Sequence, residues 1–241
     1  MMHCGLLGQK LSHSYSPAIH SMLGDYEYKL YETEPENVET FLRKGDFDAL
    51  NVTIPYKREV MAYLDSVSPE AQAIGAVNCI RRTPDGRLEG FNTDIIGLRE
   101  ALSELLGFAE PGEALILGTG GASQAVQYAL AERGIPFALV SRDPAKGNYT
   151  YDNLPCEVVE QSRLIVNASP VGTYPNVTEA PRIPYAYLTP DHYLLDLVYN
   201  PEVTQFLDYG RQRGARILNG HVMFVEQAEA SWRIWNGEEL L

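Results

Sequence analysis

Short apolar runs alternate with stretches of helical periodicity along this chain. Between Ile95 and Leu106, apolar residues recur every three or four positions, which predicts an amphipathic helix. Short apolar runs bounded by turn residues predict buried strands. Strands that alternate with helices are typical of an α/β fold with parallel sheets. The expected strands are 48–54, 114–117, 137–140, 164–168 and 193–198, and the expected helices are 55–65, 95–106, 123–133, 222–235 and one that starts at Pro17.

The length of 241 residues favours one or two domains. We expect two α/β domains, with residues 1–92 as the first and residues 93–218 as the second. The last segment, 219–241, contains a helix that would return to the first domain. Active sites favour the cleft between such domains.

The composition of the chain argues against nucleic acid, membranes and metal ions as partners. The chain has 32 acidic and 19 basic residues and a net charge of −13, so general binding to nucleic acid or to an anionic membrane is not expected. No apolar run approaches the ~18 residues of a membrane span. Three cysteines without a C-x-x-C spacing exclude a disulfide scaffold and suit a reducing cytoplasm, where we expect the protein. The histidines show no metal-binding spacing, so no metal is expected.

A glycine loop lies between the strand 114–117 and the following helix. Gly118 and Gly120 form a Gly-x-Gly pattern, Gly121 follows, and Ser123 is small at the third motif position. Such glycines let backbone N–H groups approach a pyrophosphate, whose charge the helix N-terminus favours. The alternative is an ordinary glycine-rich turn.

The end of the next strand bears on the choice of cofactor. NAD needs a carboxylate there for the ribose 2′-hydroxyl, whereas NADP suits an arginine. Arg142 and Lys146 follow Ser141 and could hold a 2′-phosphate, while Asp143 would repel it. NADP is therefore favoured, and the alternative is a solvated turn with a surface ion pair.

Two serines precede the helix that starts at Pro17. Ser16 is well placed as its N-cap. In an extended backbone, Ser14 and Ser16 would face one side, where they would suit a substrate carboxylate. The alternative is a capped helix without a ligand.

Lys57 is a candidate for acid–base chemistry. It falls in the first turn of the helix expected over 55–65, where the helix dipole disfavours a cation. Asn51 and Thr53 are polar positions on one face of the preceding strand and need partners if buried. Asp94 is a natural N-cap of the next helix, but if it faces Lys57 the two form a proton-transfer pair. The alternative for Lys57 is a solvated surface lysine.

Two further polar residues lie at informative positions. Gln227 is the polar member of an apolar stripe in the last helix, where a polyhydroxylated ligand would supply partners; otherwise it lies at the stripe's edge. Tyr199 ends an apolar run, and thus lies at the C-terminal edge of a strand, where α/β sites form.

Taken together and in order, these segments resemble the shikimate dehydrogenase family over nearly the whole chain. The matching segments are His13–Pro17, Asn51–Lys57, Ile74–Asn78, Asn92–Asp94, Gly118–Ala122, Asn167–Gly172, Asp196–Pro201 and Asn219–Gln227.

The resemblance implies an α/β fold with an N-terminal substrate-binding domain and a Rossmann-like NADP-binding domain. It implies reversible, NADP-dependent reduction of 3-dehydroshikimate to shikimate in the pathway to chorismate and aromatic amino acids. Lys57 and Asp94 would be the catalytic pair. The implied substrate-binding residues are Ser14, Ser16, Asn51, Thr53, Asn78, Tyr199 and Gln227. The implied cofactor-binding residues are Gly118, Gly120, Gly121, Ala122, Ser141, Arg142, Lys146 and Gly220.

Some positions depart from the family pattern. Cys79 stands where the family usually has Thr, Ser141-Arg142-Asp143 replaces Asn-Arg-Thr, and His221 replaces an apolar residue. The stretch 146–162 is shorter than usual. Asp143 leaves open an NAD-preferring quinate/shikimate dehydrogenase, against which Arg142 argues. A methylenetetrahydrofolate dehydrogenase also pairs a catalytic lysine with an NADP domain, but the serine pair and Asn92–Asp94 favour the shikimate family. A non-catalytic ligand sensor is the third alternative, against which Lys57 and Asp94 argue. The oligomeric state stays open between a monomer and a homodimer.

Overall fold

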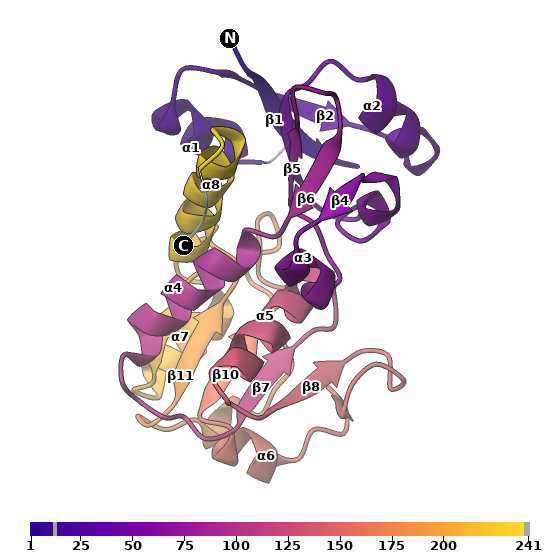
Figure 1. Cartoon of the computed structure of the whole chain (residues 1–241). Helices are drawn as coiled ribbons and strands as arrows, with labels where there is room; N and C mark the ends of the chain where they lie inside the picture. Colours follow the sequence, from indigo (N-terminus) through magenta and orange to yellow (C-terminus); the bar gives the residue numbers. More distant parts are fainter. Residues whose placement is uncertain (12–13, 239–241) are drawn as a thin grey trace. The chain divides into compact units, whose positions relative to one another are not determined.

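A computed structural model describes residues 1–11 and 14–238 of the chain (Figure 1). The chain divides into two compact units, one of Met1–Asp94 with Val225–Leu241 and one of Ile95–Phe224. Two helices run across these divisions. The helix α4, Asp94–Leu106, begins with the last residue of the N-terminal segment of the first unit, and α8, His221–Trp235, begins in the second unit.

The sheet of the first unit is mixed rather than parallel. Its strand order is β2-β1-β3-β5-β6-β4, and β5 runs antiparallel to both β3 and β6. The expectation of a parallel sheet is therefore wrong for β5, because the short segment 83–87 between β5 and β6 permits a hairpin but no crossover. The strands are β1 His3–Gly8, β2 Glu27–Glu32, β3 Ala49–Val52, β4 Ser66–Val67, β5 Cys79–Arg82 and β6 Leu88–Phe91.

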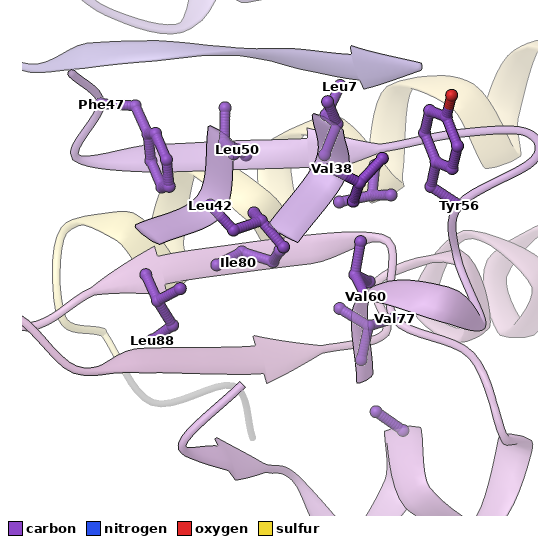
Figure 2. Close-up of a cluster of buried hydrophobic side chains, with 12 residues drawn as sticks. Leu7, Val38, Leu42, Phe47, Leu50, Tyr56, Val60, Val77, Ile80 and Leu88 are labelled. Carbon is purple, nitrogen blue, oxygen red and sulfur yellow. The ribbon is translucent and has the colours of Figure 1, made fainter. Parts of the chain in front are cut away.

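Each face of this sheet is covered by a different set of elements. On one face, Leu7 and Leu50 share a buried cluster with Val38 and Leu42 of α2 (Figure 2). On the other, Cys4 and other small strand residues pack with Trp235 of α8. Because side chains alternate along a strand, Asn51 of β3 points to the same face as α8. The helices and 3₁₀ turns are α1 Ser16–Leu23, η1 Pro35–Asn37, α2 Val38–Lys44, η2 Glu59–Tyr63 and α3 Pro69–Ile74.

A stack of aromatic rings joins α8 to α1 and β2. The ring of His20 stacks against Tyr28 and against Trp235, with centroid distances of 4.1 and 5.2 Å. Its Nδ1 atom lies 2.5 Å from the Tyr26 hydroxyl. Burial lowers the pKa of His20 to about 4, so the ring is neutral at pH 7.

The second unit contains a fully parallel sheet with the strand order β12-β11-β10-β7-β8-β9. The strand β7 has the expected bounds, whereas the helix that follows the glycine loop begins two residues earlier than expected, at Gly121. The strands are β7 Ala114–Leu117, β8 Phe137–Ser141, β9 Tyr149–Thr150, β10 Leu164–Asn167, β11 Tyr193–Asp196 and β12 Arg216–Leu218. The helices and turn are α5 Gly121–Glu132, α6 Cys156–Gln161, η3 Tyr185–Tyr187 and α7 Gln205–Gln212.

A buried carboxylate lies at the C-terminal end of β11. Asp196 has no exposed surface, and it accepts hydrogen bonds from Asn167 Nδ2 (2.9 Å), Val198 N (3.0 Å) and Thr204 Oγ1 (2.5 Å). Burial raises its pKa to about 7. Thr204 also caps α7, so this carboxylate joins the ends of β10 and β11 to the start of that helix.

Candidate active site

The first unit contains a buried ion pair between Lys57 and Asp94. Lys57 Nζ lies 2.5 Å from Asp94 Oδ2, and the two side chains are 18% and 8% exposed. The Lys57 side chain therefore keeps a small exposed fraction, whereas Asp94 is almost fully buried. An ammonium held in this way can donate a proton to a bound oxygen atom or stabilise its negative charge.

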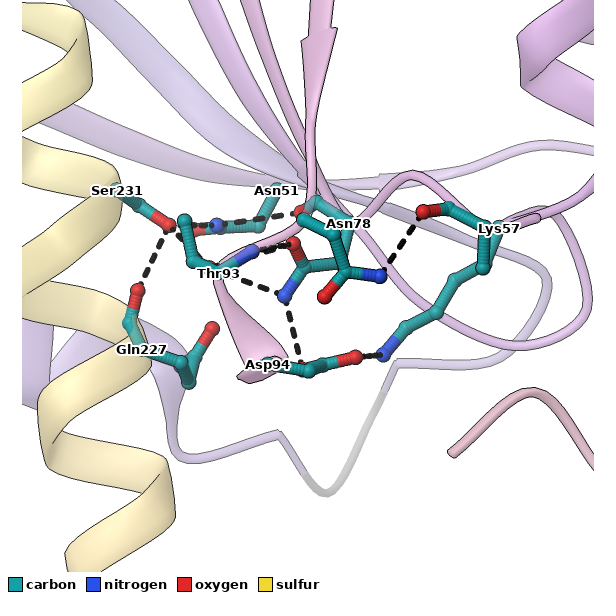
Figure 3. A network of polar contacts seen from close by, with 9 residues as sticks. Asn51, Lys57, Asn78, Thr93, Asp94, Gln227 and Ser231 are labelled. Atoms are coloured by element: carbon teal, nitrogen blue, oxygen red, sulfur yellow. Dashed lines mark hydrogen bonds and ion pairs between the residues drawn. The ribbon is translucent and has the colours of Figure 1, made fainter. Parts of the chain in front are cut away.

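The second oxygen atom of Asp94 is also held. Asp94 Oδ1 accepts a hydrogen bond of 2.8 Å from Asn78 Nδ2, and Asn78 is almost fully buried next to β5 (Figure 3). The Asn78 Oδ1 atom in turn accepts from the backbone N–H of Thr93 at 2.6 Å. Asn78 therefore fixes the carboxylate that contacts Lys57.

This arrangement extends through buried side chains to α8 and β2. Asn51 donates from Nδ2 to Ser231 Oγ (2.8 Å), and its Oδ1 accepts from the Tyr28 hydroxyl (2.8 Å). Ser231 Oγ lies 3.1 Å from Thr93 Oγ1. Burial raises the pKa of Tyr28 well above its usual value, and the nearby Ser16 side chain offsets part of that effect. The buried polar groups of this network are thus satisfied by one another: Asn51, Asn78, Thr93, Asp94 and Ser231.

The local structure around Lys57 differs from the expectation. Residues 54–58 form turns, and a 3₁₀ helix follows at Glu59–Tyr63, so the prediction of an α-helix over 55–65 is wrong. The carbonyl of Lys57 accepts a hydrogen bond from Val77 N (2.7 Å) instead of from a residue one helical turn ahead. The backbone of Lys57 is therefore held by the segment that leads to Asn78, and the helix-dipole argument does not apply.

The two serines also differ from the expectation. Ser16 is the first residue of α1, and Tyr15 occupies the N-cap position with φ −89° and ψ 0°. The prediction that Ser16 caps the helix from an extended backbone is therefore wrong. Ser14 Oγ instead accepts from the Ser16 backbone N–H at 3.2 Å. Both serines are half-buried, and the neighbouring His13 of the motif lies outside the described residues.

The remaining proposed substrate residues occupy different places. Thr53 follows β3 and is half-buried. Gln227 belongs to the first-unit part of α8, and its backbone carbonyl accepts from Ser231 Oγ at 2.8 Å. Tyr199 lies in the second unit, where its ring stacks on Phe224 at 4.4 Å. It is therefore not among the side chains that the first unit brings together.

Thr93 and Ser231 were missed as site residues by the sequence analysis. Thr93 was included within the matching segment Asn92–Asp94, and Ser231 lies 138 positions further along the chain. One signal could have found Ser231, because it lies four residues after Gln227 and thus on the same face of α8. Cys79, a departure from the family, is buried beside Ser231 and Trp235; burial raises its pKa to about 12, so it remains a thiol.

The glycine loop of the second unit connects β7 to α5. Gly118 has a φ of +113°, and a side chain there would approach the Ala168 carbonyl at 3.2 Å. At Gly120 and Gly121, a Cβ atom would enter open space. The first turn of α5, with half-buried Ala122, therefore presents backbone N–H groups to that space, which fits a bound pyrophosphate.

The loop that follows β8 contains the expected phosphate-binding residues. Ser141 Oγ lies 3.1 Å from Thr119 Oγ1 and accepts from Asp143 N, which joins this loop to the glycine loop. Arg142 is exposed, and Lys146 Nζ lies 3.5 Å from Asp143 Oδ2. An exposed ion pair of this kind contributes little free energy, about 0–1 kcal/mol, so a phosphate can compete for the lysine.

Gly220 is constrained by packing. A Cβ atom at this position would lie 2.3 Å from the Leu197 carbonyl oxygen, and its backbone N–H bonds to Val198 O. Glycine is therefore required for the close approach of α8 to the end of β11, whatever ligand binds nearby.

Neither a cluster of metal ligands nor a membrane-spanning helix is present in the described part of the chain. Within residues 1–11 and 14–238, no group of three or more His, Cys, Asp or Glu side chains is arranged to hold a metal ion. None of the helices described is both long enough and apolar enough to cross a membrane.

Known proteins that resemble this chain match it over almost its whole length. The family description "Shikimate dehydrogenase substrate binding domain" matches residues 6–80. A shikimate dehydrogenase (NADP(+)) of Methanococcus maripaludis is 35% identical over 97% of this chain and 91% of its own length. The solved structure of shikimate 5-dehydrogenase from Thermus thermophilus, in complex with NADP(H) and shikimate, has a TM-score of 0.88 and 35% identity, and it covers 98% of this chain and 94% of that chain.

A second solved structure represents a related activity. Quinate dehydrogenase from Corynebacterium glutamicum, in complex with NAD, has a TM-score of 0.87 and 27% identity, and it covers 98% of this chain and 94% of that chain. The curated relatives with 32–38% identity are instead named as NADP-dependent shikimate dehydrogenases.

The parallel sheet and its glycine loop define the class of protein, an α/β oxidoreductase of the dinucleotide-binding type. The similarity to relatives over almost the whole length identifies the family within this class. The chain belongs to the shikimate dehydrogenase family.

Proposed function

We propose that this protein catalyses the reversible, NADP-dependent reduction of 3-dehydroshikimate to shikimate. The observation that carries the proposal is the 2.5 Å contact between Lys57 Nζ and Asp94 Oδ2 in a buried polar network. The names of the relatives support the same reaction and the same cofactor. We assign the first unit, Met1–Asp94 with Val225–Leu241, to substrate binding, and the second unit, Ile95–Phe224, to dinucleotide binding.

Lys57 is the proton donor of the proposed reaction. When bound, NADPH supplies the hydride that the ketone carbon accepts. The ammonium group of Lys57 donates a proton to the ketone oxygen, and in the reverse direction the amine takes the proton back from the hydroxyl group. Asp94 Oδ2 keeps Nζ in position, while Asn78 holds the other carboxylate oxygen so that Asp94 does not rotate away.

The substrate residues supply polar groups of two kinds. Ser14 and Ser16, next to the N-terminus of α1, are proposed to bind the substrate carboxylate. Side-chain amides and hydroxyls are proposed to surround the ring and its hydroxyl groups, and these come from Asn51, Thr53, Asn78, Tyr199 and Gln227.

The cofactor residues fit the phosphate groups of NADP. Gly120, Gly121 and Ala122 are proposed to hold the pyrophosphate with backbone N–H groups, and Gly118 provides the preceding turn. Ser141, Arg142 and Lys146 are proposed to hold the 2′-phosphate, and Gly220 to border the nicotinamide. The alternatives with NAD preference or without turnover are not favoured by the curated relatives.

The test is a panel of two substrates and two cofactors. Purified protein is given shikimate or quinate with NADP or NAD, and nicotinamide absorbance is followed. We expect the highest kcat/KM for shikimate with NADP. A preference for NAD would contradict the cofactor assignment, and binding of shikimate without turnover would contradict the enzymatic proposal.

A further inference from the structure

We propose that Ser231 is a positioning residue of this active site: its hydroxyl group directs the Thr93 hydroxyl, which supports the Asn78 amide and, through it, the Asp94 carboxylate. This inference rests on the proposed function. Ser231 lies in α8, is fully buried, and lies far in sequence from Asn51, Asn78, Thr93 and Asp94 (Figure 3). It contacts neither Lys57 nor Asp94 directly.

The hydroxyl proton of Ser231 has one favoured acceptor. Ser231 Oγ donates to the carbonyl of Gln227 at 2.8 Å, a group that can only accept. Asn51 Nδ2, at 2.8 Å, can only donate. Ser231 Oγ therefore also acts as the acceptor towards Thr93 Oγ1, which lies 3.1 Å away.

This choice determines the direction of the next hydrogen bonds. Because the single hydroxyl proton of Thr93 points to Ser231, Thr93 Oγ1 accepts from Asn78 Nδ2 at 3.0 Å. The other proton of Asn78 Nδ2 then points to Asp94 Oδ1 at 2.8 Å. Asn78 Oδ1 is occupied by the Thr93 N–H at 2.6 Å, so the amide has one orientation that satisfies every partner.

Removal of the Ser231 hydroxyl would change this order. The Thr93 proton would lose its acceptor and could turn to Asn78 Oδ1, which lies 3.2 Å away. Asn51 Nδ2 would keep a weaker contact with the Asn78 carbonyl at 3.4 Å. The amide that holds Asp94 would then be less firmly fixed, and Lys57 would be less well aligned.

Ser231 also links a proposed substrate-binding residue, Gln227, to the residues that hold the proton donor. Its hydroxyl joins the turn of α8 that contains Gln227 to the strand that contains Asn51 and to the start of α4. The Ser231 hydroxyl therefore sets the position of Gln227, a proposed substrate-binding residue, relative to the proton donor Lys57. Small errors in such positions are costly, up to about 100-fold in rate for a displacement near 1 Å.

The experiment compares Ser231→Ala and Ser231→Cys with Ser68→Ala as a control. Ser68 accepts from Ala71 N at the start of α3, so its loss removes one hydroxyl hydrogen bond of the same unit outside the network. We expect both Ser231 variants to lower kcat about 10- to 100-fold with little change in KM for NADP. Ser68→Ala should keep the wild-type kcat. Ser231→Cys fills nearly the same volume, which keeps the test valid if the alanine variant folds poorly.

A double-mutant cycle with Asn78→Ala separates positioning from general destabilisation. If Ser231 acts through Asn78, Ser231→Ala should cause little further loss of kcat in the Asn78→Ala background. Additive losses, or a kcat for Ser231→Ala within twofold of wild type, would overturn the proposal.

A second readout does not depend on the proposed reaction. The side-chain amide of Asn78 should exchange its protons faster in Ser231→Ala than in wild type when both are followed by NMR. Unchanged exchange would overturn the positioning role. Absence of shikimate turnover in wild type together with faster exchange would overturn the proposed function and leave the role of Ser231 in orienting the amide.

Discussion

Each unit buries an aspartate, and the two are held in different ways. Asp94 of the first unit contacts an ammonium group and one amide, whereas Asp196 of the second unit is held by an amide, a hydroxyl and a backbone N–H, all neutral. Asp94 retains a small exposed fraction, and Asp196 has none.

The difference separates a chemical role from a structural one. A carboxylate beside a partly exposed cation can orient that cation for proton transfer. A carboxylate surrounded by neutral donors instead fixes the backbone segments from which the donors come, and burial raises its pKa to about 7. We therefore expect changes at Asp94 to affect turnover and changes at Asp196 to affect stability.

The largest expected difference between the two units appears when each aspartate is replaced by asparagine. Asp94→Asn should lower kcat on the order of 1000-fold, because a neutral amide does not hold the Lys57 ammonium group. Asp196→Asn should keep kcat close to the wild-type value, since an amide oxygen can still accept from Val198 N and Asn167. Steady-state oxidation of shikimate measures both, and equal losses would remove the proposed distinction.

The next effect is a pH dependence of opposite sign in the two units. The pKa of Asp196 is raised to about 7 in the folded state, so its contribution to stability is present below pH 3.8 and is lost as pH rises towards 7, by roughly 4 kcal/mol. The pKa of His20 is lowered to about 4, so stability is lost as pH falls from 6.5 towards 4, by roughly 3 kcal/mol.

These two slopes partly cancel in the wild-type protein. Urea unfolding between pH 4 and pH 7 should show that Asp196→Asn gains stability relative to wild type as pH rises. His20→Phe, which keeps a ring in contact with Tyr28 and Trp235, should gain stability relative to wild type as pH falls. Parallel curves for a variant and wild type would show that the residue in question does not titrate as described.

A smaller loss is expected when the acceptor at Asp196 is removed altogether. Asp196→Ala leaves three buried donors without their acceptor and should unfold with a free energy about 2 kcal/mol lower than that of Asp196→Asn. The control is Asp85→Ala, because Asp85 forms an exposed ion pair with Arg87 in the first unit. Equal free energies of unfolding for the two Asp196 variants would contradict the role of this carboxylate in fixing the loops.

The smallest effect concerns the loop after β8. Arg142→Ala should raise KM for NADP roughly tenfold and leave KM for NAD unchanged, because only NADP has a phosphate for the guanidinium group. Asp143→Ser should lower KM for NADP, since it releases Lys146 from its 3.5 Å ion pair. Arg211→Ala, which removes an exposed arginine of the second unit that pairs with Asp208, is the control. Equal changes in both KM values would remove the role of Arg142.

Local patterns predicted the second unit better than the first. The strand β7 and the helix α5 lie where apolar runs and glycines indicate them, because a parallel α/β unit is built from short, regular segments. The hairpin of β5 and β6 was not predicted, and the carbonyl of Lys57 is held by a distant residue, Val77, which no local pattern reveals.

The sequence predicts the pairing of Lys57 with Asp94, but it does not predict the buried side chains that hold Asp94 in place. Asn78 was expected near a ligand, and its contacts with both Thr93 and Asp94 emerge only from the fold. Ser231 was missed because a serine in a helix carries no chemical signal of its own. Its position depends on how α8 packs against β3, which is a tertiary property.

Lys57 is proposed to transfer the proton in the oxidation and reduction of shikimate. The most direct measurement compares Lys57→Ala with wild type and with Lys44→Ala, a change of an exposed lysine in α2, for turnover of shikimate with NADP and for shikimate affinity by calorimetry. We predict that Lys57→Ala binds shikimate with nearly wild-type affinity and loses turnover on the order of 100- to 10,000-fold, while Lys44→Ala is unchanged. Turnover of Lys57→Ala at the wild-type rate would show that Lys57 does not transfer the proton.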